Sequence, residues 1–301
     1  MTSRRILSVC LLGACLMGVL STFRSAGAEE PISLSTAERE RCLAVLRTGL
    51  RSDEFWPAMH AAEAMTLAGQ GQEVIAALKP RLPQETNDQR RCGLARELVR
   101  AGDRDSLDLL FAILGDPKSI GRIHAAESLY KVGEIGDGTL LGAAMTQTDV
   151  PQLQLMAAAA LAKSGRKPAM ALLREKLKSD DRLVRNTVCF ALARLGDASD
   201  VAGLTAQLQA ETDPLARANL IQALACLGDP QGRELLAKSL TAPEPGIRAA
   251  AAEHAGHARC TEYQAPLRKL LDDPALDPRI RAAQSLVLLS RPAPTKTGRV
   301  P

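Results

Sequence analysis

The chain has 301 residues, of which 46% are apolar and only 2% are aromatic. This balance favours a helical core of Ala, Leu, Val and Met and excludes an aromatic-rich β-sandwich. The formal net charge is only +4, which excludes the strongly basic surface expected of a nucleic-acid-binding protein.

The first 28 residues have the pattern of a secretory signal peptide. Arg4 and Arg5 precede an apolar run from Ile6 to Leu20, and Ala26-Gly27-Ala28 provides the small residues of a cleavage site. Cleavage after Ala28 is therefore expected, which predicts an exported protein, periplasmic or extracellular. A second interpretation takes Leu12-Gly13-Ala14-Cys15 as a lipobox and leaves a lipoprotein anchored at Cys15.

Removal of residues 1–28 changes the charge of the chain. Three arginines are lost, which leaves 35 basic residues against 34 acidic ones. The mature chain is nearly neutral and is predicted to have no transmembrane span and no nucleic-acid partner.

Glycines recur with a nearly constant period along the mature chain. Gly69, Gly102, Gly133, Gly165, Gly196 and Gly228 are separated by 33, 31, 32, 31 and 32 residues. The residue eleven positions before each glycine opens a repeat unit and is called position 0. The same frame continues through two further units that lack the glycine. The eight starts, most of them arginine, are Ala58, Arg91, Arg122, Gln154, Arg185, Arg217, Arg248 and Arg279. A period of this length indicates a repeat protein.

Each unit is predicted to be a helical hairpin. Positions 3, 4, 7 and 10 are nearly always apolar, as in Arg217 to Gly228, and second amphipathic segments such as Ala169 to Leu177 lie between the units. Helices this short are marginal alone in water and must stack on their neighbours. The fold class is therefore all-α, an α-solenoid of eight two-helix repeats over residues 29–290.

Turn residues mark the helix ends. A glycine after the last turn is expected to adopt the left-handed conformation, and a following aspartate, as in Gly196-Asp197, favours the next N-terminus. Asp-Pro pairs such as Asp213-Pro214 mark a second boundary in each unit. The repeated arginines are predicted to be structural and to reach turn carboxylates and backbone carbonyls of the adjacent unit.

The Asp-Pro turn, the period, and the Arg-x-x-Ala-Ala-x-Ala-Leu-x-x-Leu-Gly-Asp pattern resemble HEAT-like repeats of the phycobilin-lyase type, over residues 36–290. Tetratricopeptide and ankyrin signatures are not found in the sequence. The resemblance implies an armadillo-like right-handed superhelix in which the arginine-opened helices line the concave face.

A cationic stripe is expected on the open face of these helices. If positions 3, 4, 7 and 10 face the core, positions 2, 5 and 9 share the opposite face. Position 9 is basic in four consecutive units, and Phe190 occupies position 5 of one of them; the predicted partner-binding residues are Arg100, Lys131, Lys163, Arg194 and Phe190. The partner would be a protein or an acidic peptide. The alternative is that cations are favoured here only because the last turn of a helix attracts them.

Two histidine–glutamate pairs are candidate metal ligands. His60 with Glu63 and His124 with Glu127 each share a helical face, but the intervening unit carries Arg96, which opposes cation binding. We therefore predict no metal, no cofactor and no catalytic residue. A metal-dependent or lyase-like enzyme and a structural subunit of an envelope assembly remain the alternatives to a binding scaffold.

Five cysteines remain in the mature chain, without a C-x-x-C pair: Cys42, Cys92, Cys189, Cys226 and Cys260. They are expected to be small buried residues, and whether any two of them pair stays open. Residues 291–301 are rich in proline and are predicted to be disordered.

Overall fold

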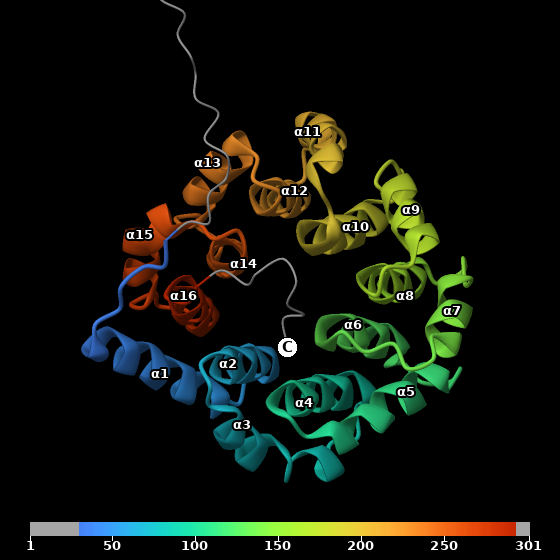
Figure 1. Cartoon of the computed structure of the whole chain (residues 1–301), viewed down its shortest axis with the longest axis horizontal. Coiled ribbons are helices and arrows are strands. Elements are labelled where there is room, and N and C mark those ends of the chain that lie inside the picture. The colour runs from blue at the N-terminus through green and yellow to red at the C-terminus, as the bar shows by residue number, and fades with distance from the viewer. Residues whose placement is uncertain (1–29, 293–301) are drawn as a thin grey trace, which may run out of the picture.

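The structure, a computed structural model, describes residues 30–292. Over this range the chain folds into eight helical hairpins that form a closed ring (Figure 1). The predicted signal peptide and the lipobox lie outside the described residues, as does most of the predicted tail; only Arg291 and Pro292 are described, directly after the last helix. The predicted all-α solenoid is confirmed.

Two concentric layers of helices make up the ring (Figure 1). The inner helices carry position 0 of the repeat within their first four residues. They are α2 (Phe55–Leu67), α4 (Asp88–Ala101), α6 (Arg122–Val132), α8 (Pro151–Lys163), α10 (Arg182–Leu195), α12 (Pro214–Cys226), α14 (Pro245–His257) and α16 (Leu276–Leu289). The outer helices are α1 (Thr36–Leu50), α3 (Gly71–Leu78), α5 (Leu107–Gly115), α7 (Thr139–Met145), α9 (Lys167–Lys176), α11 (Val201–Ala210), α13 (Pro230–Ser239) and α15 (Gln264–Leu270). Within residues 30–292 no helix combines the length and the apolar character needed to cross a membrane.

The turn residues set the helix ends largely as expected. The Asp213 carboxylate accepts a hydrogen bond from the backbone N–H of Ala216, with Pro214 as first residue of α12. Gly102 has φ 111° and ends α4 in the left-handed conformation. Gly196 differs, with φ −69° and ψ 171°, because the chain extends there so that Asp197 can cap a short 3₁₀ turn.

Arg185 and Arg248 bind backbone carbonyls and carboxylates, as predicted, but the carbonyls belong to their own unit and only the carboxylates to the next one. Arg185 donates to the carbonyls of Ser179 and Asp180, and its other nitrogen lies 2.8 Å from Glu211 of the next unit. Arg248 repeats the arrangement, with Asp273 as its carboxylate at 2.7 Å. Arg185 and Arg248 thus satisfy carbonyls that follow an outer helix and join two units.

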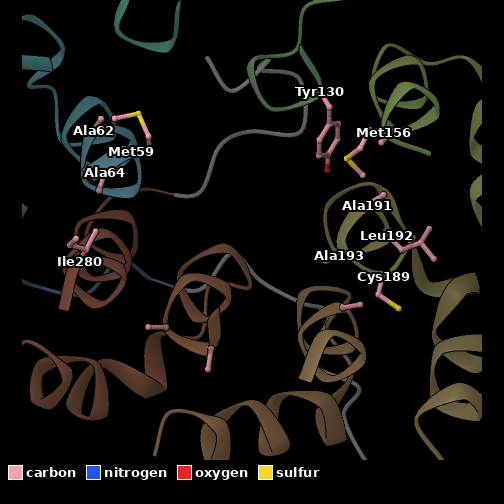
Figure 2. Packing of buried hydrophobic residues seen from close by; sticks show 14 of the residues in the cluster. Met59, Ala62, Ala64, Tyr130, Met156, Cys189, Ala191, Leu192, Ala193 and Ile280 are labelled. Carbon is pink, nitrogen blue, oxygen red and sulfur yellow. The ribbon is translucent and has the colours of Figure 1, made fainter. Parts of the chain in front are cut away.

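Small residues bring the inner helices close together. The closest approach includes Gly256 of α14, where a Cβ atom would lie only 2.9 Å from Cα of Ser285 on α16. The Ser285 hydroxyl donates to the carbonyl of Ala252 across the same contact, at 2.6 Å. Alanines fill most of the remaining positions between inner helices, and Figure 2 shows Ala62, Ala64, Ala191 and Ala193 in this role.

The ring closes because the first unit packs on the last helix. The end of α1 meets α16 at Gly49, where a Cβ atom would lie 2.6 Å from Cδ1 of Ile280 and 2.8 Å from Cβ of Ala61. The backbone N–H of Ile32 donates to the carbonyl of Leu289 at 3.0 Å. The resemblance implied a superhelix; the eight units complete one turn, and the last unit meets the first.

Charged groups add to this closing contact. The guanidinium of Arg268 on α15 binds both Glu38 of α1 and the carbonyl of Ser33. Nearer the axis, the His60 Nδ1 atom of α2 lies 2.7 Å from a carboxylate oxygen of Asp277 on α16. The contact therefore includes an apolar centre and polar pairs on both sides of it.

Gly49 provides a test of the closing contact. Gly49→Ala places a methyl group against Ile280 and Ala61, and we expect the free energy of unfolding to fall by about 1–3 kcal/mol, as for overpacked cores. Gly142→Ala in α7, where a Cβ would meet nothing within 4 Å, is the matched control; it should instead gain up to about 1 kcal/mol from helix propensity. Equal effects of the two substitutions in urea unfolding would contradict the proposed tightness of the contact.

Candidate functional site

One stripe of every inner helix faces the ring axis. It consists of positions 2, 5 and 9 of the repeat, as expected from the sequence, together with position −2 in the first turn or just before it. Residues of these positions from several helices line common pockets. The axial face is therefore built in layers, one repeat position per layer.

The outermost layer, at position −2, is apolar in four units, and we call these residues the apolar mouth: Trp56, Ile120, Leu183 and Leu215. Their exposed fractions are 39%, 67%, 51% and 60%. The one other large hydrophobic residue exposed in the described range is Leu140 on the outer helix α7. Exposed apolar side chains concentrated at one repeat position indicate a contact surface.

A pocket of about 280 Å³ opens below the mouth between α6 and α12, and we call it the amide pocket. Its lining combines amides, a hydroxyl and a carboxylate with apolar side chains: Ile123, Glu127, Gln152, Met156, Asn186, Thr187, Phe190 and Asn219. Side-chain amides offer both donors and acceptors. The pocket could therefore receive a polar backbone beside an apolar side chain.

A second pocket, of about 210 Å³, lies beside the first between α2 and α6 and shares Glu127 with it. The Trp56 indole stacks on the His124 imidazole, with ring centroids 5.6 Å apart and planes at 22°. The two rings come from α2 and α6, and Gly93 of α4 lies between these helices. A Cβ atom there would lie only 3.0 Å from the Phe55 ring and 3.4 Å from Trp56, so the absence of a side chain leaves room for the stack.

Charged side chains of several inner helices lie beneath the pockets. We call them the hub: Glu63, Arg96, Glu97, Arg100, Glu127, Lys131, Lys163, Arg194, Glu253 and Arg281. Arg281 of α16 joins Glu63 of α2, at 3.1 Å, to Glu253 of α14, at 3.3 Å. Burial alone would raise the pKa of Glu63, but Arg100 and Arg281 outweigh it and hold this pKa well below its ordinary value. Similarly, Lys131 and Arg96 outweigh burial at Glu127 and hold its pKa at about 2.

The four predicted cations all lie in the hub, but three of them are not on an open surface. Arg100 binds Glu97 and Glu63, Lys131 lies 2.8 Å from Glu127, and Arg194 lies 2.6 Å from Glu253. Glu97 and Glu127 lie on the same helices as Arg100 and Lys131. Glu63 comes from the neighbouring α2 and Glu253 from α14, and together these glutamates neutralise the three cations. Lys163 is exposed, and its ammonium group donates to the carbonyls of Tyr130 and Lys131. The partner-binding role of these residues stays a prediction.

Phe190 lies where its repeat position indicates, on the axial face and in the amide pocket with Glu127. It is only partly exposed, because its ring meets Tyr130 edge-on at 5.9 Å and the Arg194 guanidinium at 4.9 Å. Phe190 therefore shapes the pocket wall and holds the cations in place.

The histidine–glutamate pairs considered for a metal are engaged in other contacts. His60 binds Asp277, Glu63 binds two arginines, and His124 stacks on Trp56. In the part of the chain that the structure describes, no group of three or more His, Cys, Asp or Glu residues is arranged to hold a metal ion.

All five cysteines of residues 30–292 are free thiols. Cys42, Cys92, Cys189 and Cys260 are buried, and Cys226 is half-buried in the hub layer of position 9. Burial raises the pKa of the Cys226 thiol to about 12, and Arg194 only partly offsets this. Such thiols are poor nucleophiles at neutral pH.

The apolar mouth was not predicted from the sequence. A signal was present, because four of the eight repeat units carry Trp, Ile or Leu at position −2. Only the ring geometry shows that this position lies on the axial face.

Comparison with known families supports the repeat assignment. A family profile described as HEAT repeats matches residues 139–225 and 201–287, which span α7 to α16. A search of curated proteins finds no significant match.

Several solved structures are similar in fold. Human deoxyhypusine hydroxylase, solved with glycerol, is 20% identical, with 83% of this chain and 96% of that chain covered and a TM-score of 0.41. The YibA protein of Escherichia coli is 17% identical, with coverages of 85% and 98% and a TM-score of 0.35. An engineered protein is 18% identical, with coverages of 83% and 78% and a TM-score of 0.34. Similarity at this level does not bear on what the chain binds or catalyses.

The buried histidines predict that the folded state loses stability in mild acid. Burial lowers the pKa of His254 to about 4, from an ordinary value near 6.5. As the pH falls below 6.5 the unfolded chain takes up a proton that the folded chain does not, so the folded state loses stability until about pH 4. Between pH 7 and pH 5 this residue should cost roughly 2 kcal/mol.

His254→Leu should remove that part of the pH dependence, measured by urea unfolding at the two pH values. The pKa values of His60 and His124 are also lowered by burial, so the variant should keep a smaller residual dependence. An undiminished difference between pH 7 and pH 5 in the variant would rule out His254 as its source.

Proposed function

Since the chain belongs to the HEAT-repeat family, we propose that it is an exported, non-catalytic scaffold that binds a peptide segment of a protein partner on the axial face of its ring. Repeat proteins of this kind use a continuous inner surface for binding. Export follows from the signal-peptide pattern of residues 1–28.

The observation that carries the proposal is the apolar mouth. Four of the five large exposed hydrophobic residues in the described range share one repeat position and surround one end of the axial face. Apolar side chains exposed in this way lose contact with water when a partner covers them, at about 25 cal/mol per Å².

The amide pocket favours an extended peptide as the occupant. Gln152, Asn186 and Asn219 come from three successive inner helices and lie beside the apolar walls formed by Met156 and Phe190. Amides spaced along a groove suit the alternating donors and acceptors of a peptide backbone, while the apolar walls suit its side chains.

Mouth substitutions test the proposal. The full mature protein would be used to capture partners from the envelope fraction, as wild type and as a Leu183→Glu/Leu215→Glu double variant. Both leucines are more than half exposed, so the variant should fold. We expect it to retain less than about a tenth of the specific partner, because each carboxylate would have to be desolvated on binding.

Leu140→Glu is the matched control, because Leu140 is also an exposed leucine but lies on the outer helix α7. It should capture the same partner as wild type. Equal capture by the mouth variant and the control, or no partner specific to wild type, would refute the proposal.

A further inference from the structure

Among the buried side-chain atoms without a hydrogen-bond partner in the described structure, two lie close to the Tyr130–Phe190 ring pair. They are the Tyr130 hydroxyl oxygen and the Arg194 Nη1 atom. Tyr130 is only 1% exposed, and Figure 2 shows its side chain extending from α6 beside Met156. Burying such groups without a hydrogen bond costs about 1–3 kcal/mol each, so a native partner is expected for them.

Both residues contact the Phe190 ring. The rings of Tyr130 and Phe190 meet edge-on at 5.9 Å, and the Arg194 guanidinium carbon lies 4.9 Å from the centroid of the Phe190 ring. The Nη2 atom of Arg194 is occupied by Glu253 at 2.6 Å. Nη1 therefore remains available as a donor on the same guanidinium.

A third donor lies beside the same pair. The Lys163 ammonium nitrogen lies 5.5 Å from the centroid of the Tyr130 ring and binds only the carbonyls of Tyr130 and Lys131, at 3.1 and 3.3 Å. Each of the other three predicted cations has a glutamate partner, whereas no described carboxylate lies within ion-pair distance of Lys163. Among the four cations of position 9, Lys163 is thus the one without a glutamate contact in the described range.

We propose that a small oxyanion, a carboxylate or a phosphate, binds in the hub to the Tyr130 hydroxyl, Arg194 Nη1 and Lys163 Nζ. An oxyanion accepts hydrogen bonds through several oxygens and can take up a hydroxyl, a guanidinium and an ammonium donor together. Its negative charge would match Lys163. A metal cation is disfavoured at this point by the positive charges of Arg194, Lys163 and the nearby Arg100. Burial, Arg100 and Arg194 lower the pKa of Lys163.

The site does not depend on a peptide partner at the apolar mouth. A free anion from solution and an anionic group of a larger ligand would use the same donors. The inference therefore goes beyond the proposed scaffold role and can be tested without any partner.

Calorimetric titration of the full mature protein tests the site, with inorganic phosphate in one series and succinate in another, at constant ionic strength set with sodium chloride. Wild type should bind at least one of the two anions with a stoichiometry of one. Phosphate and succinate separate the two chemical sources of the oxyanion. Absence of saturable binding for both would overturn the proposal.

Three variants locate the site. Lys163→Gln should weaken binding at least tenfold, and Tyr130→Phe, which keeps the ring and removes the hydroxyl, should weaken it several-fold. Lys167→Gln on α9 changes an exposed lysine outside the axial face and should leave the affinity unchanged. Equal affinities of the Lys163 and Lys167 variants would overturn the assignment.

Unfolding measurements give a second readout that does not require a binding-competent variant. Tyr130→Phe removes a buried hydroxyl that has no described partner, so without added anion the variant should be at least as stable as wild type. Saturating anion should then raise the unfolding temperature of wild type more than that of the variant. An equal rise in both proteins would contradict a role for the hydroxyl.

Discussion

The fold depends on the contact between the last inner helix, α16, and the first unit, α1 and α2. The helices have only 7–15 residues and cannot persist without neighbours. In an open array the two terminal units would each expose one apolar face. Here Gly49 lets α1 lie against Ile280, so each unit has neighbours on both sides. Closure also creates the hub, because Arg281 reaches Glu63 only when α16 lies beside α2.

The repeat converts sequence position into depth along the ring axis. Position −2 gives the apolar mouth, positions 2 and 5 give the two pockets, and position 9 supplies the hub cations. Three or four inner helices line each pocket, so a change at one side chain alters a surface shared by several helices. Buried ion pairs of this kind contribute little net stability when complete, and they become costly when one member is removed.

The helices, the frame and the role of the arginines could be predicted from the sequence because they depend on contacts within a unit or between neighbours. The apolar spacing after Arg217 and the Asp213-Pro214 turn each act locally. Closure could not be predicted, because it depends on a small rotation between units added eight times. The stripe of cations was placed correctly, but the partner of Arg194 could not be predicted, because Glu253 lies 59 residues away in sequence.

The backbone hydrogen bond between Ile32 and Leu289 joins the two ends of the described fold. In a closed ring of similar units no interface is structurally first or last. A chain joined across this point by a short linker and opened at an exposed turn elsewhere, such as the one after Gly165, would make the same set of helix contacts. The ring itself specifies only which unit lies beside which. Which unit comes first in the sequence does not change these contacts.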